Sequence, residues 1–104
     1  MDSKKRLEES KLFTPYKLGS VTLRNRVIRS AAFESMGKDF SPTQALKDYH
    51  VSVAKGGVGM TTVAYASINR SGISFNKQLW LRDEIVPALR DLTDAVHNEG
   101  AAVG

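Results

Sequence analysis

The side chains that carry most enzyme chemistry are scarce in this sequence. It contains no cysteine, which excludes a thiolate nucleophile, a disulfide and a cysteine-based zinc site. Its two histidines, His50 and His97, lie far apart, and both fall in segments whose apolar residues recur with helical spacing. We therefore predict surface or helix-capping roles for both histidines, and the sequence assigns no catalytic residue and no metal ligand.

A pair of carboxylates and a glycine-rich run could each form a functional site, but each also has a purely structural interpretation. Glu34 and Asp39 supply two carboxylates, but nothing in the sequence fixes their separation, so we interpret both as solvated loop residues. The run Gly56-Gly57-Val58-Gly59 has the composition of a phosphate-binding loop. However, it follows a helical segment and precedes a strand, which is the reverse of a dinucleotide-binding fingerprint. We interpret it as a helix stop followed by tight packing.

Strand signals recur along the chain after a polar leader at residues 1–11. Residues 16–23 predict a hairpin around a Gly-Ser turn. Residues 27–32 predict a first interior strand that ends in small residues, and the β-branched run at 58–65 predicts a second strand buried on both faces. A third strand is predicted to begin at residue 101.

Helix signals fall between these strands. Ser41 is predicted to cap a helix that has Pro42 at its first position and ends at the glycines after Lys55. A polar loop is predicted up to about Arg82, followed by a helix over residues 83–99 with a proline in its first turn. Strands that alternate with helices at this spacing predict an α/β fold with a parallel sheet.

The predicted sheet is too small to stand alone. Two strands and the start of a third leave both edges and one face of a parallel sheet uncovered. We therefore expect that this chain is one part of a larger fold, and that segments outside it complete the sheet.

Charge and composition narrow the class of protein. The net charge is +4, and residues 1–30 hold eight basic residues against three acidic ones. Nucleic-acid binding is the alternative that this charge raises, but the segment lacks interleaved aromatic residues, so a solvated surface is preferred. No apolar run approaches the roughly 18–20 residues that span a bilayer, and no signal peptide is recognised. We expect a cytoplasmic protein that binds neither nucleic acid nor a membrane.

Several stretches of this sequence, in their order along the chain, resemble those of the Old Yellow Enzyme family, the NADH:flavin oxidoreductases that bind FMN. The stretches are Leu12-Phe13-Thr14-Pro15 with Leu18-Gly19 and Leu23-Arg24-Asn25-Arg26-Val27; Ala31-Ala32-Phe33-Glu34-Ser35-Met36; Gly56-Gly57-Val58-Gly59-Met60-Thr61-Thr62-Val63-Ala64-Tyr65; and Asp94-Ala95-Val96-His97-Asn98-Glu99-Gly100-Ala101. The resemblance covers nearly all of residues 12–104. It implies the N-terminal portion of a TIM (β/α)8 barrel: a hairpin on the barrel floor, then two strand–helix units and the start of a third strand.

The resemblance also implies a site. Chemistry in such barrels lies at the carboxyl ends of the strands. There, Ala31, Ala32 and Phe33 would face the flavin ring of FMN, and Tyr65 would contact its polar edge. The sequence departs from the common family pattern, which often has Pro at position 31, Thr or Cys at position 33 and Ala at position 65.

Two hypotheses follow from the resemblance. In the first, the chain belongs to an oxidoreductase in which NAD(P)H reduces FMN and the flavin passes hydride to a small-molecule acceptor such as an activated alkene. In the second, the 104 residues are a non-catalytic fragment that binds flavin weakly or not at all and docks onto a complementary barrel fragment, because such a barrel needs about 250 residues.

Overall fold

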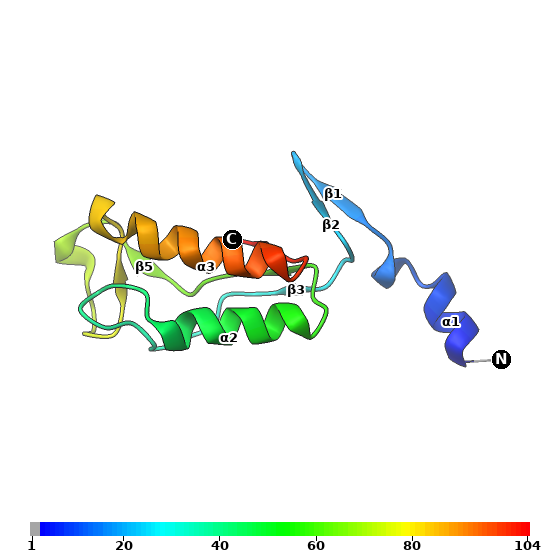
Figure 1. The fold of residues 1–104 in the computed structure, drawn as a ribbon, viewed down its shortest axis with the longest axis horizontal. Coiled ribbons are helices and arrows are strands. Elements are labelled where there is room, and N and C mark those ends of the chain that lie inside the picture. Colours follow the sequence, from blue (N-terminus) through cyan, green and yellow to red (C-terminus); the bar gives the residue numbers. More distant parts are fainter. Residues whose placement is uncertain (1–2) are drawn as a thin grey trace.

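The computed structural model describes residues 3–104 and shows an α/β body with an N-terminal arm that extends away from it (Figure 1). The arm consists of helix α1 (Ser3–Glu9), a 3-10 turn η1 (Lys11–Phe13) and an antiparallel hairpin of β1 (Tyr16–Leu18) and β2 (Val21–Leu23). The hairpin is the one predicted from the Gly-Ser turn. The leader is helical from its third residue, and residues 1–2 of the predicted leader lie outside the described part of the chain.

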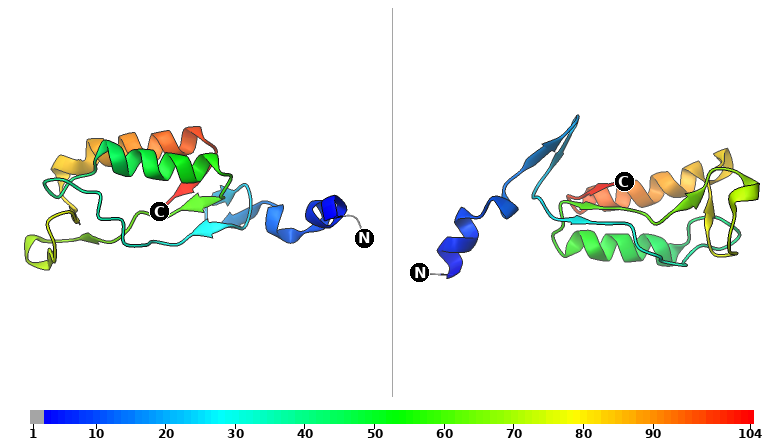
Figure 2. Two further views of the ribbon diagram at one scale, coloured as in Figure 1. Left: turned by 90° about the horizontal axis from the view of Figure 1, so that it is seen from below. Right: turned by 180° about the vertical axis from the view of Figure 1, so that it is seen from behind.

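The body is built on a three-stranded parallel sheet in the order β3-β4-β7, with β3 at Ile28–Arg29, β4 at Met60–Thr61 and β7 at Ala102–Val103. Helices α2 (Gln44–Lys55) and α3 (Val86–Asn98) pack on the same face of this sheet (Figure 2). On the opposite face, Ile28 is 48% exposed. The predicted parallel α/β arrangement is therefore present, and one face of its sheet is open.

The interior strands are shorter than predicted. Residues 27–32 and 58–65 were expected to be strands, but each contributes only two paired residues. One physical reason lies in the carbonyl of Thr62, which accepts a hydrogen bond of 2.9 Å from the side chain of Arg29. The backbone N–H of Val63 still donates to the carbonyl oxygen of Gly104 at 2.8 Å. The chain after β4 therefore stays hydrogen-bonded to the chain after β7, while its pairing with the chain after β3 ends.

The segment predicted as a polar loop up to Arg82 contains regular structure. Strands β5 (Ala66–Ser67) and β6 (Leu79–Trp80) pair in parallel, and 3-10 turns η2 (Arg70–Gly72) and η3 (Asp83–Ile85) flank β6. The pair is anchored because Leu79 is only 5% exposed and belongs to the core. The second helix begins at Val86 rather than Asp83, and Pro87 lies in its first turn as predicted.

Helix α2 begins two residues later than predicted. Thr43, not Ser41, is its N-cap, and the Thr43 hydroxyl accepts a hydrogen bond of 3.2 Å from the backbone N–H of Leu46. Ser41 is instead engaged outside the helix, where its hydroxyl accepts a hydrogen bond from Arg82 at 3.1 Å. Thr43 therefore caps α2, and Ser41 joins the preceding loop to Arg82.

The glycine-rich run ends α2 and permits a close approach. Gly57 has a φ of +107°, a conformation that L side chains rarely adopt. A Cβ on Gly59 would lie 2.4 Å from the backbone oxygen of Asn25, so only glycine fits there. The run is therefore a helix stop with tight packing, as the sequence indicated.

The core lies between the two helices and the sheet. Its buried members are Leu46 and Ala54 of α2, Leu92 and Val96 of α3, and Leu79 and Ala101. None of the helices within residues 3–104 is long and apolar enough to cross a membrane.

Candidate functional site

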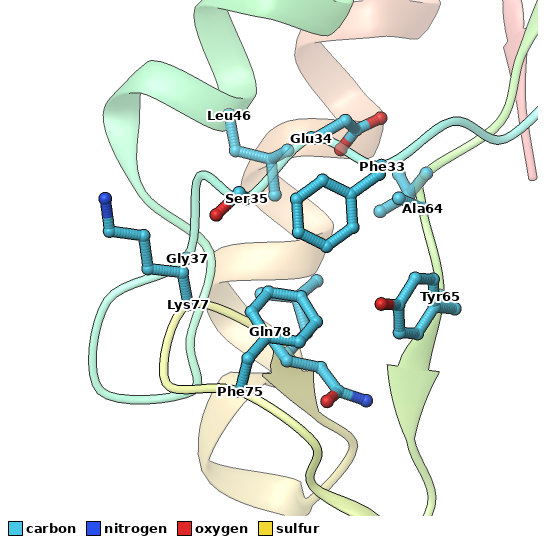
Figure 3. Close-up of a pocket in the computed structure, with 12 residues that line it drawn as sticks. Phe33, Glu34, Ser35, Gly37, Leu46, Ala64, Tyr65, Phe75, Lys77 and Gln78 are labelled. Atoms are coloured by element: carbon cyan, nitrogen blue, oxygen red, sulfur yellow. The ribbon is translucent and has the colours of Figure 1, made fainter.

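The residues expected at the flavin lie just beyond the carboxyl ends of β3 and β4. The side chains of Ala31 and Ala32 are exposed, Phe33 is 65% exposed and Tyr65 is 54% exposed. The rings of Phe33 and Tyr65 lie with their centroids 6.3 Å apart (Figure 3). The structure thus brings the two aromatic residues together at one edge of the sheet, with two small residues immediately before Phe33.

A third ring, which the sequence pattern did not predict at this site, completes the cluster. Phe75 comes from the segment before β6, and its centroid lies 5.0 Å from that of Phe33 and 5.8 Å from that of Tyr65. The loop that follows Phe33 and the segment that follows Phe75 are joined by a backbone hydrogen bond of 2.9 Å, which the N–H of Gly37 donates to the carbonyl oxygen of Lys77. An isolated phenylalanine in a polar stretch was the only available signal, because the contact depends on how this segment folds back. We call Phe33, Tyr65 and Phe75 the aromatic cluster.

The cavity beside the aromatic cluster is small. Its volume is about 20 Å³, enough for about one water molecule, and its walls include Ala64 and Gln78 as well as the rings. A large planar ligand therefore does not fit between the rings and the core. Such a ligand has room against the exposed side of the cluster.

A buried charged network lies directly behind the aromatic cluster. The side chain of Glu34 is 4% exposed, and its Oε1 accepts a hydrogen bond of 3.1 Å from Nη1 of Arg29. Arg29 also donates from Nη2 to the hydroxyl of Tyr49 at 2.9 Å, and its guanidinium lies 4.8 Å from the centre of that ring. The prediction that Glu34 is a solvated loop residue is wrong, because the fold turns its carboxylate inward onto an arginine of the preceding strand.

His50 belongs to the same network. It is completely buried, and its Nδ1 lies 2.8 Å from the hydroxyl oxygen of Thr61 on β4. Its Nε2 lies 2.9 Å from Oε1 of Glu34, without the alignment of a hydrogen bond. The predicted surface or capping role of His50 is therefore wrong, because α2 turns this residue toward the sheet. His97 is exposed in the last turn of α3, as predicted.

The protonation of His50 is governed by its burial. Removal from water lowers the pKa of His50 below its usual value of 6.5, and the Arg29 charge acts in the same direction. The carboxylate of Glu34 raises the pKa and only partly offsets the effect of burial. The imidazole is therefore neutral at pH 7, and Arg29 is the group that balances the charge of Glu34.

The other carboxylate considered from the sequence is not part of this network. Asp39 is exposed, and its backbone has a φ of +53°, a conformation uncommon for residues other than glycine. Its backbone oxygen accepts a hydrogen bond of 3.2 Å from Arg82. Across residues 3–104, no group of three or more His, Asp or Glu side chains is arranged to hold a metal ion.

Comparison with known proteins identifies relatives over most of the chain. It is 42% identical over 90 residues to a 4,4'-dithiodibutanoate disulfide reductase of Rhodococcus erythropolis, and it covers 22% of that protein. It is 45% identical over 94 residues to a probable N-methylproline demethylase of Rhizobium meliloti, of which it covers 14%. It is also 38% identical over 99 residues to an NADPH dehydrogenase of Listeria welshimeri, of which it covers 29%. The chain therefore spans less than a third of the length of each of these relatives.

Solved structures show the same fold in part of a larger one. The Old Yellow Enzyme of Pichia sp. superposes with a TM-score of 0.84 at 20% identity, over 93% of this chain and 26% of that protein. Morphinone reductase in complex with tetrahydroNAD gives a TM-score of 0.80 at 24% identity, over 92% of this chain and 26% of the reductase. The α/β body corresponds to a portion of a TIM barrel in these enzymes.

The family assignment follows from a family match over most of the chain. Residues 11–104 match the NADH:flavin oxidoreductase / NADH oxidase family, and this range includes both strand ends and the whole α/β body. The chain belongs to the NADH:flavin oxidoreductase / NADH oxidase family, and it covers the N-terminal part of the proteins that it matches.

Proposed function

We propose that this chain supplies one wall of the FMN site in a flavin-dependent oxidoreductase. The observation that carries the proposal is the exposed edge formed by Ala31, Ala32, Phe33 and Tyr65 beyond the carboxyl ends of two parallel strands. Barrel enzymes place their chemistry at this end of the strands. The family match supports the same assignment.

The residues at this edge fit a flat, conjugated ring. The methyl side chains of Ala31 and Ala32 allow a planar group to approach the backbone, while Phe33 and Tyr65 present aromatic surface beside them. The hydroxyl of Tyr65 offers a polar atom for the edge of such a ring. When bound, FMN would supply hydride chemistry, taking electrons from NAD(P)H and passing them to a small-molecule acceptor.

FMN titration tests this role directly. We expect Phe33→Ala and Tyr65→Ala each to weaken FMN binding roughly two- to tenfold, since aromatic stacking contributes about 0.5–1.5 kcal/mol. Binding is followed by quenching of flavin fluorescence, with the chain alone and with the complementary part of a barrel from a full-length relative. Ile68→Ala is the matched control, because Ile68 is an 81% exposed apolar residue outside the cluster. Equal affinities for all three variants would contradict the proposal.

A second proposal concerns the completeness of the site. An apolar groove of about 360 Å³ opens beside β7 and α3, lined by Val63, Leu81, Leu89 and Val103 among others. We propose that further strand–helix segments of a barrel dock there. In that case the 104 residues alone bind FMN weakly and do not oxidise NAD(P)H, and retention of one FMN per purified chain would disprove this proposal.

A further inference from the structure

The two neighbouring residues Phe33 and Glu34 point in opposite directions. Phe33 is 65% exposed and contacts Phe75, whereas the side chain of Glu34 is 4% exposed. Figure 3 shows the Phe33 ring directed toward Phe75 and the Glu34 carboxylate directed away from it. Successive side chains of an extended segment alternate in this way. One peptide unit thus joins a side chain of the aromatic cluster to a side chain of the buried network.

The segment that carries Phe33 has few other attachments. Residues 31–36 belong to no strand, and within residues 3–104 no backbone–backbone hydrogen bond fixes them. The next attachments along the chain are the hydroxyl of Thr43, which donates to the carbonyl of Met36, and the backbone bond from Gly37 to Lys77. Between β3 and Met36, the polar contacts that hold this described segment are those of the Glu34 carboxylate.

The groups that hold Glu34 are themselves fixed by the core of the fold. Arg29 is anchored by the carbonyl of Thr62 and the hydroxyl of Tyr49, both at 2.9 Å. His50 is buried and bonded to Thr61 at 2.8 Å. A single carboxylate oxygen thus connects the segment directly to β3 and α2, and His50 extends this connection to Thr61 of β4.

We propose that Glu34 is a positioning residue that sets the backbone and the ring of Phe33 at the edge where the flavin is proposed to bind. The relevance to FMN rests on the proposed function, but the positioning itself concerns only this chain. Glu34 acts through its inward contacts with Arg29 and His50, and it does not contact the cofactor.

The test replaces the charge of Glu34 while keeping its shape. We expect Glu34→Gln to shift the backbone amide NMR signal of Phe33 and to weaken the contacts between the Phe33 and Phe75 rings, with the hairpin signal of Gly19 unchanged. The matched control is Glu84→Gln, because the side chain of Glu84 is 75% exposed and lies 3.8 Å from Arg82. The control is expected to leave Phe33 unchanged.

A second variant tests the proposal if Glu34→Gln does not fold. His50→Gln removes one contact of Glu34 and retains the pair with Arg29, so we expect a smaller shift at Phe33 of the same kind. Folded variants whose Phe33 signals match those of the wild type would overturn the proposal. Unfolding of both variants would also overturn it, because the carboxylate would then stabilise the whole fold rather than position one segment.

FMN titration of the same variants separates the two proposals. We expect Glu34→Gln to bind FMN more weakly than Glu84→Gln does, at a temperature where both variants are folded. If the wild-type chain binds no FMN, alone or with the complementary part of a barrel, the proposed function fails. The NMR comparison still decides whether Glu34 positions Phe33.

Discussion

At the scale of single residues, the buried network couples protonation to stability. His50 contacts Glu34 of the loop and Thr61 of β4, Arg29 of β3 lies close enough to affect its pKa, and the ring of Tyr49 lies edge-on with its centroid 5.4 Å away. The neutral form of the imidazole is favoured in the folded state because burial disfavours its charged form. In the unfolded chain the same group titrates near 6.5.

The pH dependence of unfolding follows from this difference. Below pH 6.5 the unfolded state binds a proton at His50 that the folded state resists, so the free energy of unfolding decreases as the pH falls from 6.5 toward the lowered pKa. Above pH 6.5 the contribution of His50 is complete and level. Urea unfolding at several pH values measures this slope.

The control for this prediction is His50→Gln, which removes the titrating group and retains His97. We expect the stability of the variant to change less than that of the wild type between pH 5 and pH 7. A wild-type stability that increases as the pH falls through this range would contradict the assignment of a lowered pKa to His50.

At the scale of elements, one arginine joins the carboxyl ends of both helices. Arg24 donates to the carbonyls of Ala54 at 2.6 Å, Glu99 at 2.7 Å and Val58 at 3.0 Å. The first two carbonyls lie at the ends of α2 and α3, where the helix dipoles favour a cation. Arg24 therefore holds α2, α3 and the chain entering β4 in one arrangement.

Removal of this side chain is expected to loosen the helix ends. We predict that Arg24→Ala lowers the free energy of unfolding by about 2 kcal/mol. The substitution removes three charge-assisted hydrogen bonds, and the exposure of Arg24 to solvent reduces their contribution to this value. Arg26→Ala is the matched control, because the Arg26 guanidinium lies over the Tyr16 ring of the hairpin, 5.1 Å from its centre. Thermal unfolding compares the two, and equal losses would show that Arg24 has no special role.

At the scale of the whole molecule, the fold leaves apolar surface uncovered. Its extents are 55 × 25 × 21 Å because the arm projects from the body, as Figure 1 shows. Exposed apolar residues lie on the hairpin, on the open face of the sheet and beside the apolar groove, as with Val21, Ile28 and Leu81. Surface of this kind commonly marks a binding interface.

The apolar groove provides a prediction for docking. We expect the chain to bind a hydrophobic dye such as ANS, and we expect the complementary part of a barrel to displace the dye. Leu81→Glu places a charge in the groove and is expected to weaken this docking at least tenfold, since burying an unpaired carboxylate costs several kcal/mol. Val86→Glu is the control, because Val86 is similarly exposed but does not line the groove. Docking that survives Leu81→Glu would place the interface elsewhere.

Sequence alone determined the features that depend on neighbouring residues. The hairpin around Gly19, the helix stop at Gly57 and the proline in the first turn of α3 were predicted correctly, because turns and helix ends are set by local backbone preferences. The parallel sheet was predicted from the alternation of strands and helices, and the family from motifs in their order along the chain.

Only the tertiary structure decided which side chains meet. Glu34 was interpreted as a solvated loop residue and His50 as a surface or capping residue, yet the two side chains lie buried against each other. Phe75 joins Phe33 from more than 40 residues away. Burial of a polar residue is favourable only when partners from other elements satisfy it, and those partners are fixed by packing rather than by sequence spacing. The aromatic cluster and the charged network behind it are therefore products of the fold.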